Sequence, residues 1–264
     1  MRWTRRRVVL AALAGLVAGA AIAAPLASAL DPVHSGLDSR VVLASGRAYT
    51  LHTPPLLRRV PAMTEGRPAM IVLHGVNDTP EHFESVAGFD RYADRDGNLV
   101  AFPEGLRESF NAGLCCGDAA AYGVDDVGFL SAVVDDLRSR GAGRITVVGF
   151  SNGGMMAYRL ACERPDVVDT VGVMSATLEI PHCDGRITAL HLHGQEDTAV
   201  PFTGERYSAR LRCFLRDVRT IPAAAPGSTI TIRTIPGLDH RWTEPRDPVD
   251  ATLEFWSFAH MGAG

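Results

Sequence analysis

Short apolar runs alternate along this chain with longer segments in which apolar residues recur at helical spacing. The runs predict strands, and the spaced segments predict helices, because side chains repeat every two residues in a strand and every 3.6 residues in a helix. The predicted strands are 41–43, 48–52, 69–73, 98–102, 145–148, 168–174, 187–193 and 229–235. The predicted helices are 79–95, 125–140, 152–162, 204–214 and 248–260. This alternation indicates one α/β domain over residues 30–264, with a largely parallel sheet and helices on both faces.

The strand at 145–148 passes directly into a helix through Gly149-Phe150-Ser151-Asn152-Gly153, a G-x-S-x-G sequence. Such a sharp strand-to-helix turn strains its central residue and leaves room only for glycines on either side. The turn would hold the Ser151 hydroxyl at the carboxyl end of the strand. We therefore predict that Ser151 is a nucleophile.

A second glycine follows the strand at 69–73, in His74-Gly75-Val76. A glycine at that position lets the backbone approach a ligand closely, so the N–H groups of Val76 and Asn152 are predicted to form an oxyanion hole. His74 itself is expected to be a packed ring. The segments 54–68 and 103–122 read as loops, the second of them glycine-rich and at the edge of the sheet where α/β proteins bind ligands.

Serine needs a base, and the chain has no lysine because all 26 of its basic residues are arginine. In a strand-turn-helix site of this kind the order along the chain is serine, acid, histidine. His240 follows the last strand and is the predicted base, and Asp197, in the loop after 187–193, is the predicted acid. Glu196 is the rival acid, and Asp239 is expected to point elsewhere.

Three further histidines and two acids are expected to have structural roles or to lie at the surface. His191 and His193 alternate on one strand and are expected to pack rather than to bind a metal. His260 is expected at the surface of the last helix, and Asp135 and Asp136 are expected to be solvated.

The first 29 residues differ from the rest of the chain. Arg2, Arg5, Arg6 and Arg7 precede an apolar stretch that ends at Ala27-Ser28-Ala29, the pattern of an export signal cleaved near Ala29. The paired arginines also fit a twin-arginine signal, so the export route stays open, and an uncleaved anchor is the competing interpretation.

Charge and cysteine content narrow the function classes. Residues 30–264 keep 22 of the 26 arginines and all 30 acids, a formal charge of −8, which argues against nucleic-acid binding. Five cysteines in an exported chain predict disulfides with one thiol left over, and a metal site is the rival interpretation. Cys162 is expected to lie within reach of Cys115 or Cys116.

These motifs resemble the secreted polyhydroxybutyrate depolymerase-like esterases, a group that includes type C feruloyl esterases and some acetylxylan esterases. The matching pieces cover most of the chain after residue 70: LHG, NAGLCCG, DDVGFL, GFSNGGMMAYRLACERPD, HLHGQEDTAVPF and H-x-W. The resemblance implies an α/β-hydrolase fold, a triad on Ser151, Asp197 and His240, and ester hydrolysis without a cofactor. Two positions depart from the family pattern: Val76, where relatives often carry cysteine, and the sequence GLDHRW around His240.

We therefore expect a secreted serine esterase that acts through an acyl-enzyme on a soluble oligomer or small ester, with Trp242 and Phe202 lining its pocket. No stable membrane anchor and no metal are expected. A serine peptidase or acyltransferase would use the same triad, and an exported binding protein with a vestigial site is the non-enzymatic alternative.

Overall fold

The computed structural model describes residues 38–204 and 206–261, all within the unit His34–Gly264. The predicted export segment, residues 1–29, lies outside the described residues.

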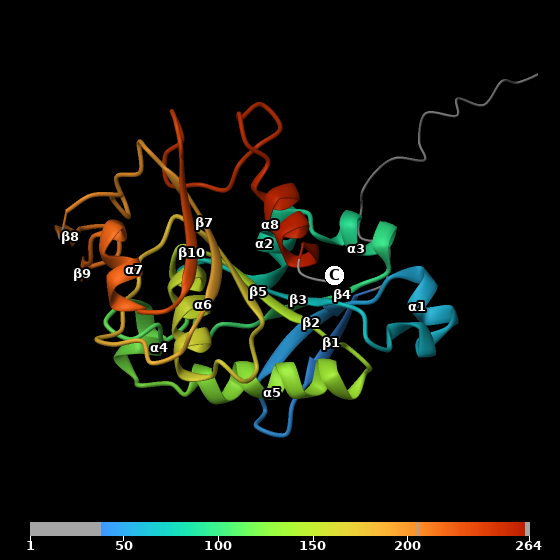
Figure 1. The fold of residues 1–264 in the computed structure, drawn as a ribbon. Coiled ribbons are helices and arrows are strands. Elements are labelled where there is room, and N and C mark those ends of the chain that lie inside the picture. Colours follow the sequence, from blue (N-terminus) through green and yellow to red (C-terminus); the bar gives the residue numbers. More distant parts are fainter. Residues whose placement is uncertain (1–37, 205, 262–264) are drawn as a thin grey trace, which may run out of the picture. The chain divides into compact units, whose positions relative to one another are not determined.

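An eight-stranded sheet forms the centre of the unit (Figure 1). Its order is β1 (Asp38–Val42), β2 (Ala48–His52), β4 (Leu99–Pro103), β3 (Ala69–Leu73), β5 (Ile145–Phe150), β6 (Thr170–Met174), β7 (Thr188–Gly194) and β10 (Thr229–Ile235). Only β2 runs against its neighbours; the other pairings from β4 to β10 are parallel. The predicted parallel sheet is thus confirmed. The carboxyl ends of β3, β5, β7 and β10 lie at the same edge.

Helices cover both faces of this sheet, as predicted. The helices α5 (Asp126–Ser139) and α6 (Asn152–Glu163) lie on one face, and α2 (Pro80–Ala87), α3 (Asp90–Asp96) and α8 (Ala251–His260) on the other (Figure 1). Each face has its own buried apolar cluster, because strands buried on both sides carry apolar residues in succession. Within the described ranges, none of the helices is both long and apolar enough to cross a bilayer.

The prediction of a helix at 204–214 is wrong. The segment forms a small antiparallel hairpin from β8 (Arg206–Ser208) and β9 (Cys213–Leu215). Tyr207, Leu211 and Phe214 have helical spacing in the sequence, but Arg212 has a φ of 58° and so interrupts any helix there. In the hairpin Tyr207 pairs with Phe214, and their rings are 5.4 Å apart.

Three other segments differ in detail from the expectation. The predicted helix 79–95 is two helices, because Gly88 takes a left-handed φ of 59° and ends α2. The loop predicted at 54–68 contains α1 (Pro55–Arg59) and η1 (Pro61–Thr64), and the loop at 103–122 contains α4 (Gly117–Ala121). Two further short helices follow the hairpin, η2 (Val218–Thr220) and α7 (Ile221–Ala224).

Two side chains expected to be solvated are bonded instead. Asp136 accepts hydrogen bonds from the hydroxyl of Tyr49 and from Nε of Arg140. His260 is half-buried: its Nδ1 donates to the carbonyl of Trp256 at 2.6 Å, and its Nε2 accepts from Asn98 at 2.7 Å. Both side chains therefore join elements of the fold.

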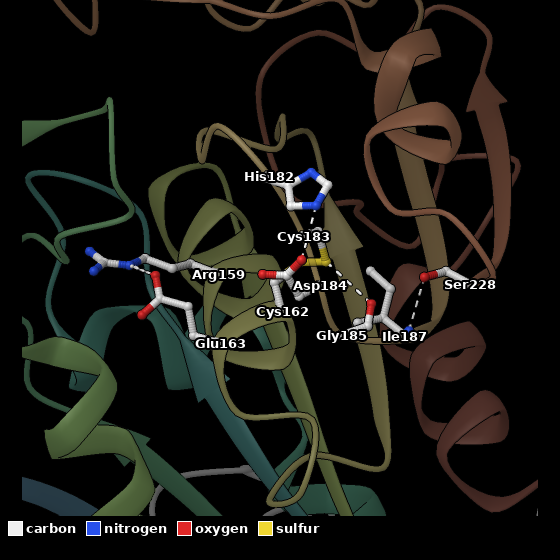
Figure 2. The surroundings of a disulfide bond; sticks show 9 residues. All are labelled: Arg159, Cys162, Glu163, His182, Cys183, Asp184, Gly185, Ile187 and Ser228. Carbon is white, nitrogen blue, oxygen red and sulfur yellow. Dashed lines mark hydrogen bonds and ion pairs between the residues drawn. A yellow bond between two sulfur atoms is a disulfide. The ribbon is translucent and has the colours of Figure 1, made fainter.

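The cysteine at the end of α6 pairs differently from the expectation. Cys162 forms a disulfide with Cys183, in the loop between β6 and β7, rather than with Cys115 or Cys116 (Figure 2). The two half-cystines are 21 residues apart, and a loop of that length corresponds to about 3 kcal/mol of stabilisation in the chain-entropy model. The bond fixes the 175–187 loop against α6.

Candidate active site

The turn between β5 and α6 has the strained geometry that its sequence predicts. Ser151 has φ 54° and ψ −120°, and it is buried apart from 2% of its surface. A Cβ on Gly149 would lie 2.2 Å from the carbonyl oxygen of Gly153, and one on Gly153 would lie 2.3 Å from that of Leu73. Only glycine fits at both positions, so the turn depends on them.

Three side chains from separate loops meet at this turn. Nε2 of His240 lies 2.9 Å from Oγ of Ser151, and Nδ1 of His240 lies 2.8 Å from Oδ2 of Asp197. In the neutral imidazole the Nδ1–H donates to the carboxylate, which leaves Nε2 to accept from the serine hydroxyl. This is the arrangement in which a histidine removes the proton of a serine.

Asp197 is held on its other side by the backbone. Its Oδ1 accepts hydrogen bonds from the N–H groups of Ala199 at 3.0 Å and Val200 at 2.7 Å, while its side chain is fully buried. The rival acid Glu196 is exposed, and Asp239 is exposed and paired with Arg241. Among the described residues, neither the Glu196 nor the Asp239 carboxylate has a hydrogen bond or ion pair with His240.

Behind the acid, the two histidines of β7 form a buried hydrogen-bonded chain. Nε2–H of His193 donates to the carbonyl of Val200 at 2.7 Å, so Nδ1 of His193 accepts from Nε2–H of His191 at 3.0 Å. Nδ1 of His191 then accepts from the hydroxyl of Tyr158 on α6 at 2.9 Å. Burial lowers the pKa of both histidines, which favours these neutral forms. The expectation that they pack is confirmed.

Two backbone amides close to the serine in the sequence or at the neighbouring strand end have no backbone partner among the described residues. Asn152 is the first residue of α6, a position whose N–H has no partner within the helix. Val76 follows Gly75 beyond β3, and its N–H donates to no backbone carbonyl among the described residues. Gly75 packs close to Ser151, since a Cβ added to it would lie 3.6 Å from the serine Cβ. These are the two amides that the sequence assigns to an oxyanion hole.

His74, the residue before Gly75, is 1% exposed and has both ring nitrogens occupied. Nδ1–H donates to the carbonyl of Gly75 at 2.7 Å, and Nε2 accepts from the N–H of Gly105 at 3.1 Å. Burial lowers the pKa of His74, which favours this neutral form. The ring fixes the loop after β3, in line with the expectation of a packed histidine.

The side chain of Asn152 has a role that sequence reasoning missed. Its amide pairs with the backbone of Phe110 in both directions, accepting from the N–H at 2.8 Å and donating to the carbonyl at 2.9 Å. It also donates to Sγ of Cys116 at 3.6 Å. The turn is thereby joined to the loop 110–117, and the only sequence signal was the glycine content of that loop.

A cavity of about 520 Å³ opens beside the serine. Its lining includes the turn residues Phe150 and Ser151, Trp242, and Arg210 and Leu211 of the β8–β9 hairpin. Phe202 is not among its lining residues, and its ring packs on His193 at 5.4 Å. The structure thus places Trp242 at the cavity and Phe202 behind it.

Two groups of side chains among the described residues have donor atoms close enough to share a metal ion. One is Cys115, Cys116 and Cys213, and the other is Asp38, His52 and Glu84; in each, the atoms lie within 4.8 Å of one another. Neither group contacts the serine. The hydrogen bonds of His52 to Asp38 and Asp94 account for the second group without a metal.

Several known proteins resemble this chain in sequence or in fold. No family model matches the chain. The chain is 38% identical over 173 residues to a Nocardia uniformis subsp. tsuyamanensis protein named "Putative esterase NocK", a match that covers 62% of this chain and 49% of that protein. It is 40% identical over 99 residues to feruloyl esterase C of Emericella nidulans, covering 35% of this chain and 36% of that one.

Among solved structures, an S-formylglutathione hydrolase from Agrobacterium tumefaciens superposes with a TM-score of 0.53 at 14% identity. That match covers 86% of this chain and 92% of the hydrolase, and at this identity it shows the fold. The chain spans about half the length of the first of the two sequence relatives and about a third of the second. The chain thus has an α/β-hydrolase fold, and in sequence it resembles proteins named as a putative esterase and as feruloyl esterase C.

Proposed function

We propose that this protein is an exported serine carboxylesterase with the triad Ser151, His240 and Asp197. The observation that carries the proposal is the continuous hydrogen-bonded series from the serine hydroxyl through both imidazole nitrogens to the buried carboxylate. The esterases among the sequence relatives support the reaction class.

In the proposed mechanism Oγ of Ser151 attacks the ester carbonyl while Nε2 of His240 takes the hydroxyl proton. The N–H groups of Val76 and Asn152 donate to the oxyanion that develops, and Asp197 stabilises the imidazolium through its hydrogen bond to Nδ1. His240 then protonates the departing alcohol, which leaves an acyl-enzyme. Water, deprotonated by the same imidazole, attacks the acyl group and releases the acid.

The cavity size supports a compact acyl or alcohol group. About 520 Å³ lies within the range of pockets for small ligands, and an aromatic wall at Trp242 suits a flat or aliphatic acyl chain. We include esters of hydroxycinnamic acids, acetate and short hydroxyalkanoate oligomers in the substrate class. Export would place the enzyme where such esters occur in polymers, and the Cys162–Cys183 disulfide suits an oxidising compartment.

The test is hydrolysis of p-nitrophenyl acetate, p-nitrophenyl butyrate, methyl ferulate and soluble hydroxybutyrate oligomers by the wild type and by Ser151→Ala. We expect the wild type to hydrolyse at least one of these esters and Ser151→Ala to lose about 10⁴-fold or more in kcat. Equal rates in the two proteins would refute the mechanism. N-terminal sequencing of the exported protein tests cleavage after Ala29.

Two controls separate the rival activities. Peptide p-nitroanilides test for a peptidase, and an added alcohol with product analysis tests for acyl transfer. A folded wild type that reacts with no ester and is not labelled by a fluorophosphonate would instead identify a binding protein.

A further inference from the structure

Three cysteines remain after the Cys162–Cys183 disulfide, and they converge beside the active site. Cys115 and Cys116 lie in the loop 110–117, and Cys213 begins β9 of the hairpin. Their sulfur atoms all lie within 4.8 Å of one another although the two segments are about 100 residues apart in sequence. We infer that Cys213 forms a second disulfide with one of the adjacent cysteines, Cys115 or Cys116, and so joins the β8–β9 hairpin to the loop 110–117.

The two segments are already held together without a covalent bond. Glu179 is buried between them. The backbone carbonyl of Glu179 accepts a hydrogen bond from the N–H of Leu114 at 2.8 Å. Its carboxylate accepts from the N–H of Arg216, just after β9, at 3.1 Å. The cysteines therefore do not meet through a chance surface contact. The hydrogen bonds of Glu179 hold the segment that carries Cys115 and Cys116 and the segment that carries Cys213 in place relative to each other.

The chemistry of the three thiols favours Cys213 as the attacking group. All three cysteines line a second cavity of about 530 Å³, but Cys115 and Cys116 are buried, whereas Cys213 is partly exposed. Hydrogen bonds from the other two thiols lower the pKa of Cys213, and Arg107 and Arg212 line the same cavity. A thiolate is the reactive form in disulfide exchange, and the lowered pKa raises its share at Cys213.

The covalent step needs an oxidant, which a low-molecular-weight disulfide such as oxidised glutathione supplies. The Cys213 thiolate attacks one sulfur of that disulfide, which forms a mixed disulfide and releases one thiolate. The thiolate of Cys115 or Cys116 then attacks Sγ of Cys213 and releases the second. The protein loses two protons and two electrons, and the oxidant leaves as two thiols.

The bond has a consequence for the active site. Arg210 and Leu211, between β8 and β9, line both cavities, and the loop 110–117 is bonded to the side chain of Asn152. The disulfide would fix the hairpin wall of the substrate cavity relative to the serine turn. This consequence rests on the proposed esterase activity, whereas the disulfide itself does not.

Peptide mapping tests the bond independently of any activity. The exported protein is denatured in the presence of iodoacetamide without reductant, so that buried thiols also react, and it is then cut with trypsin after arginine. Cys213 then lies in the fragment 213–216, and Cys115 and Cys116 lie in 108–138. We expect these two fragments to be joined, with one alkylated thiol left on 108–138. The fragment 160–186, which contains both Cys162 and Cys183, serves as the internal control.

Three results would overturn the inference. Alkylated 213–216 together with a 108–138 fragment two hydrogens lighter would show a bond between Cys115 and Cys116. Alkylation of all three cysteines would show free thiols. Bound zinc or copper, with all three cysteines alkylated only after denaturation, would identify a thiolate metal site instead.

The variant Cys213→Ser tests the consequence for substrate binding. In the wild type, reduction with dithiothreitol should raise KM for the preferred ester and leave kcat nearly unchanged. Cys213→Ser should show the raised KM before reduction and no further shift, and because it retains the Cys162–Cys183 disulfide it controls for reduction of that bond. An unchanged KM in the oxidised variant would refute the effect on the cavity.

Discussion

Two neighbouring carboxylates in the loop after β7 have opposite surroundings. Asp197 is buried and accepts three hydrogen bonds, two from backbone amides and one from His240. Glu196 is exposed, its backbone N–H donates to the carbonyl of Leu238, and its carboxylate has no hydrogen bond to any of the described residues. The backbone fixes one carboxylate against the imidazole and leaves the other in solvent, which makes them a matched pair for mutation.

Asp197→Asn should reduce kcat by about 10⁴-fold, because an amide that donates to His240 leaves the imidazole in the wrong tautomer for accepting the serine proton. Glu196→Gln removes the same charge one residue away and should leave kcat unchanged. The measurement is steady-state hydrolysis of the preferred ester near neutral pH, with folding checked by circular dichroism. A similar loss in both variants would point to net charge rather than to the hydrogen bond.

At the next level of organisation, the Tyr158–His191–His193 chain joins helix α6 to strand β7 and ends on Val200, whose N–H binds Asp197. This series of hydrogen-bonded side chains is fully buried, and each ring nitrogen of His191 and His193 has a partner. It therefore links the helix that begins at the serine turn with the loop that carries the acid.

Tyr158→Phe should lower the free energy of unfolding by about 1–3 kcal/mol, because it leaves Nδ1 of His191 buried without a donor. The tyrosine is remote from the substrate, so kcat should change far less than in Asp197→Asn. Urea unfolding measures the loss, with Tyr207→Phe as the control because Tyr207 is 53% exposed. Equal stability of Tyr158→Phe and wild type would show that the hydrogen bond from Tyr158 to His191 does not stabilise the fold.

Elements that depend on local pattern could be predicted from the sequence, and those that depend on distant contacts could not. The ranges predicted for β2, β3 and β10 match the structure. The strand β3 is an apolar run buried along its whole length, and β10 is rich in β-branched residues, and both patterns are typical of strands. The hairpin at Arg206–Leu215 was missed because Tyr207, Leu211 and Phe214 also fit a helix. What decides against the helix is the turn at Arg212 and the packing of Leu211 against the core.

The same distinction applies to the site. Ser151, Asp197 and His240 could be placed together from the sequence because each follows a strand of a parallel sheet, and these strands end at one edge. The partner of Cys162 and the meeting of Cys115, Cys116 and Cys213 could not, because they depend on how three loops pack beyond that edge. The sequence does not show which way the loop that carries Phe202 turns. It therefore could not show that Phe202 packs on His193 instead of lining the cavity.

Across the whole unit, buried ionisable groups give opposing contributions to stability as pH changes. Burial lowers the pKa of His191 and His193, so the unfolded chain binds more protons below about pH 6.5, and their contribution to stability falls as pH falls. Glu84 on α2 has the opposite effect. Burial, with nearby Asp38 and Asp90, raises its pKa to about 7 from an ordinary 4.5.

Because folded Glu84 binds its proton more tightly than unfolded Glu84, its contribution is fully present below about pH 4.5 and is lost as pH rises to about 7. Glu84→Gln removes this dependence. The stability of the variant relative to the wild type should therefore rise by about 1–2 kcal/mol between pH 5 and pH 8. This value is smaller than the free energy that corresponds to the full pKa shift, because Glu84 is partly accessible to solvent. Urea unfolding at both pH values measures this difference. The control variant Glu81→Gln, at an exposed position on the same helix, should show little change in stability relative to the wild type between these pH values. Parallel pH profiles of stability for Glu84→Gln and wild type would contradict a raised pKa of Glu84.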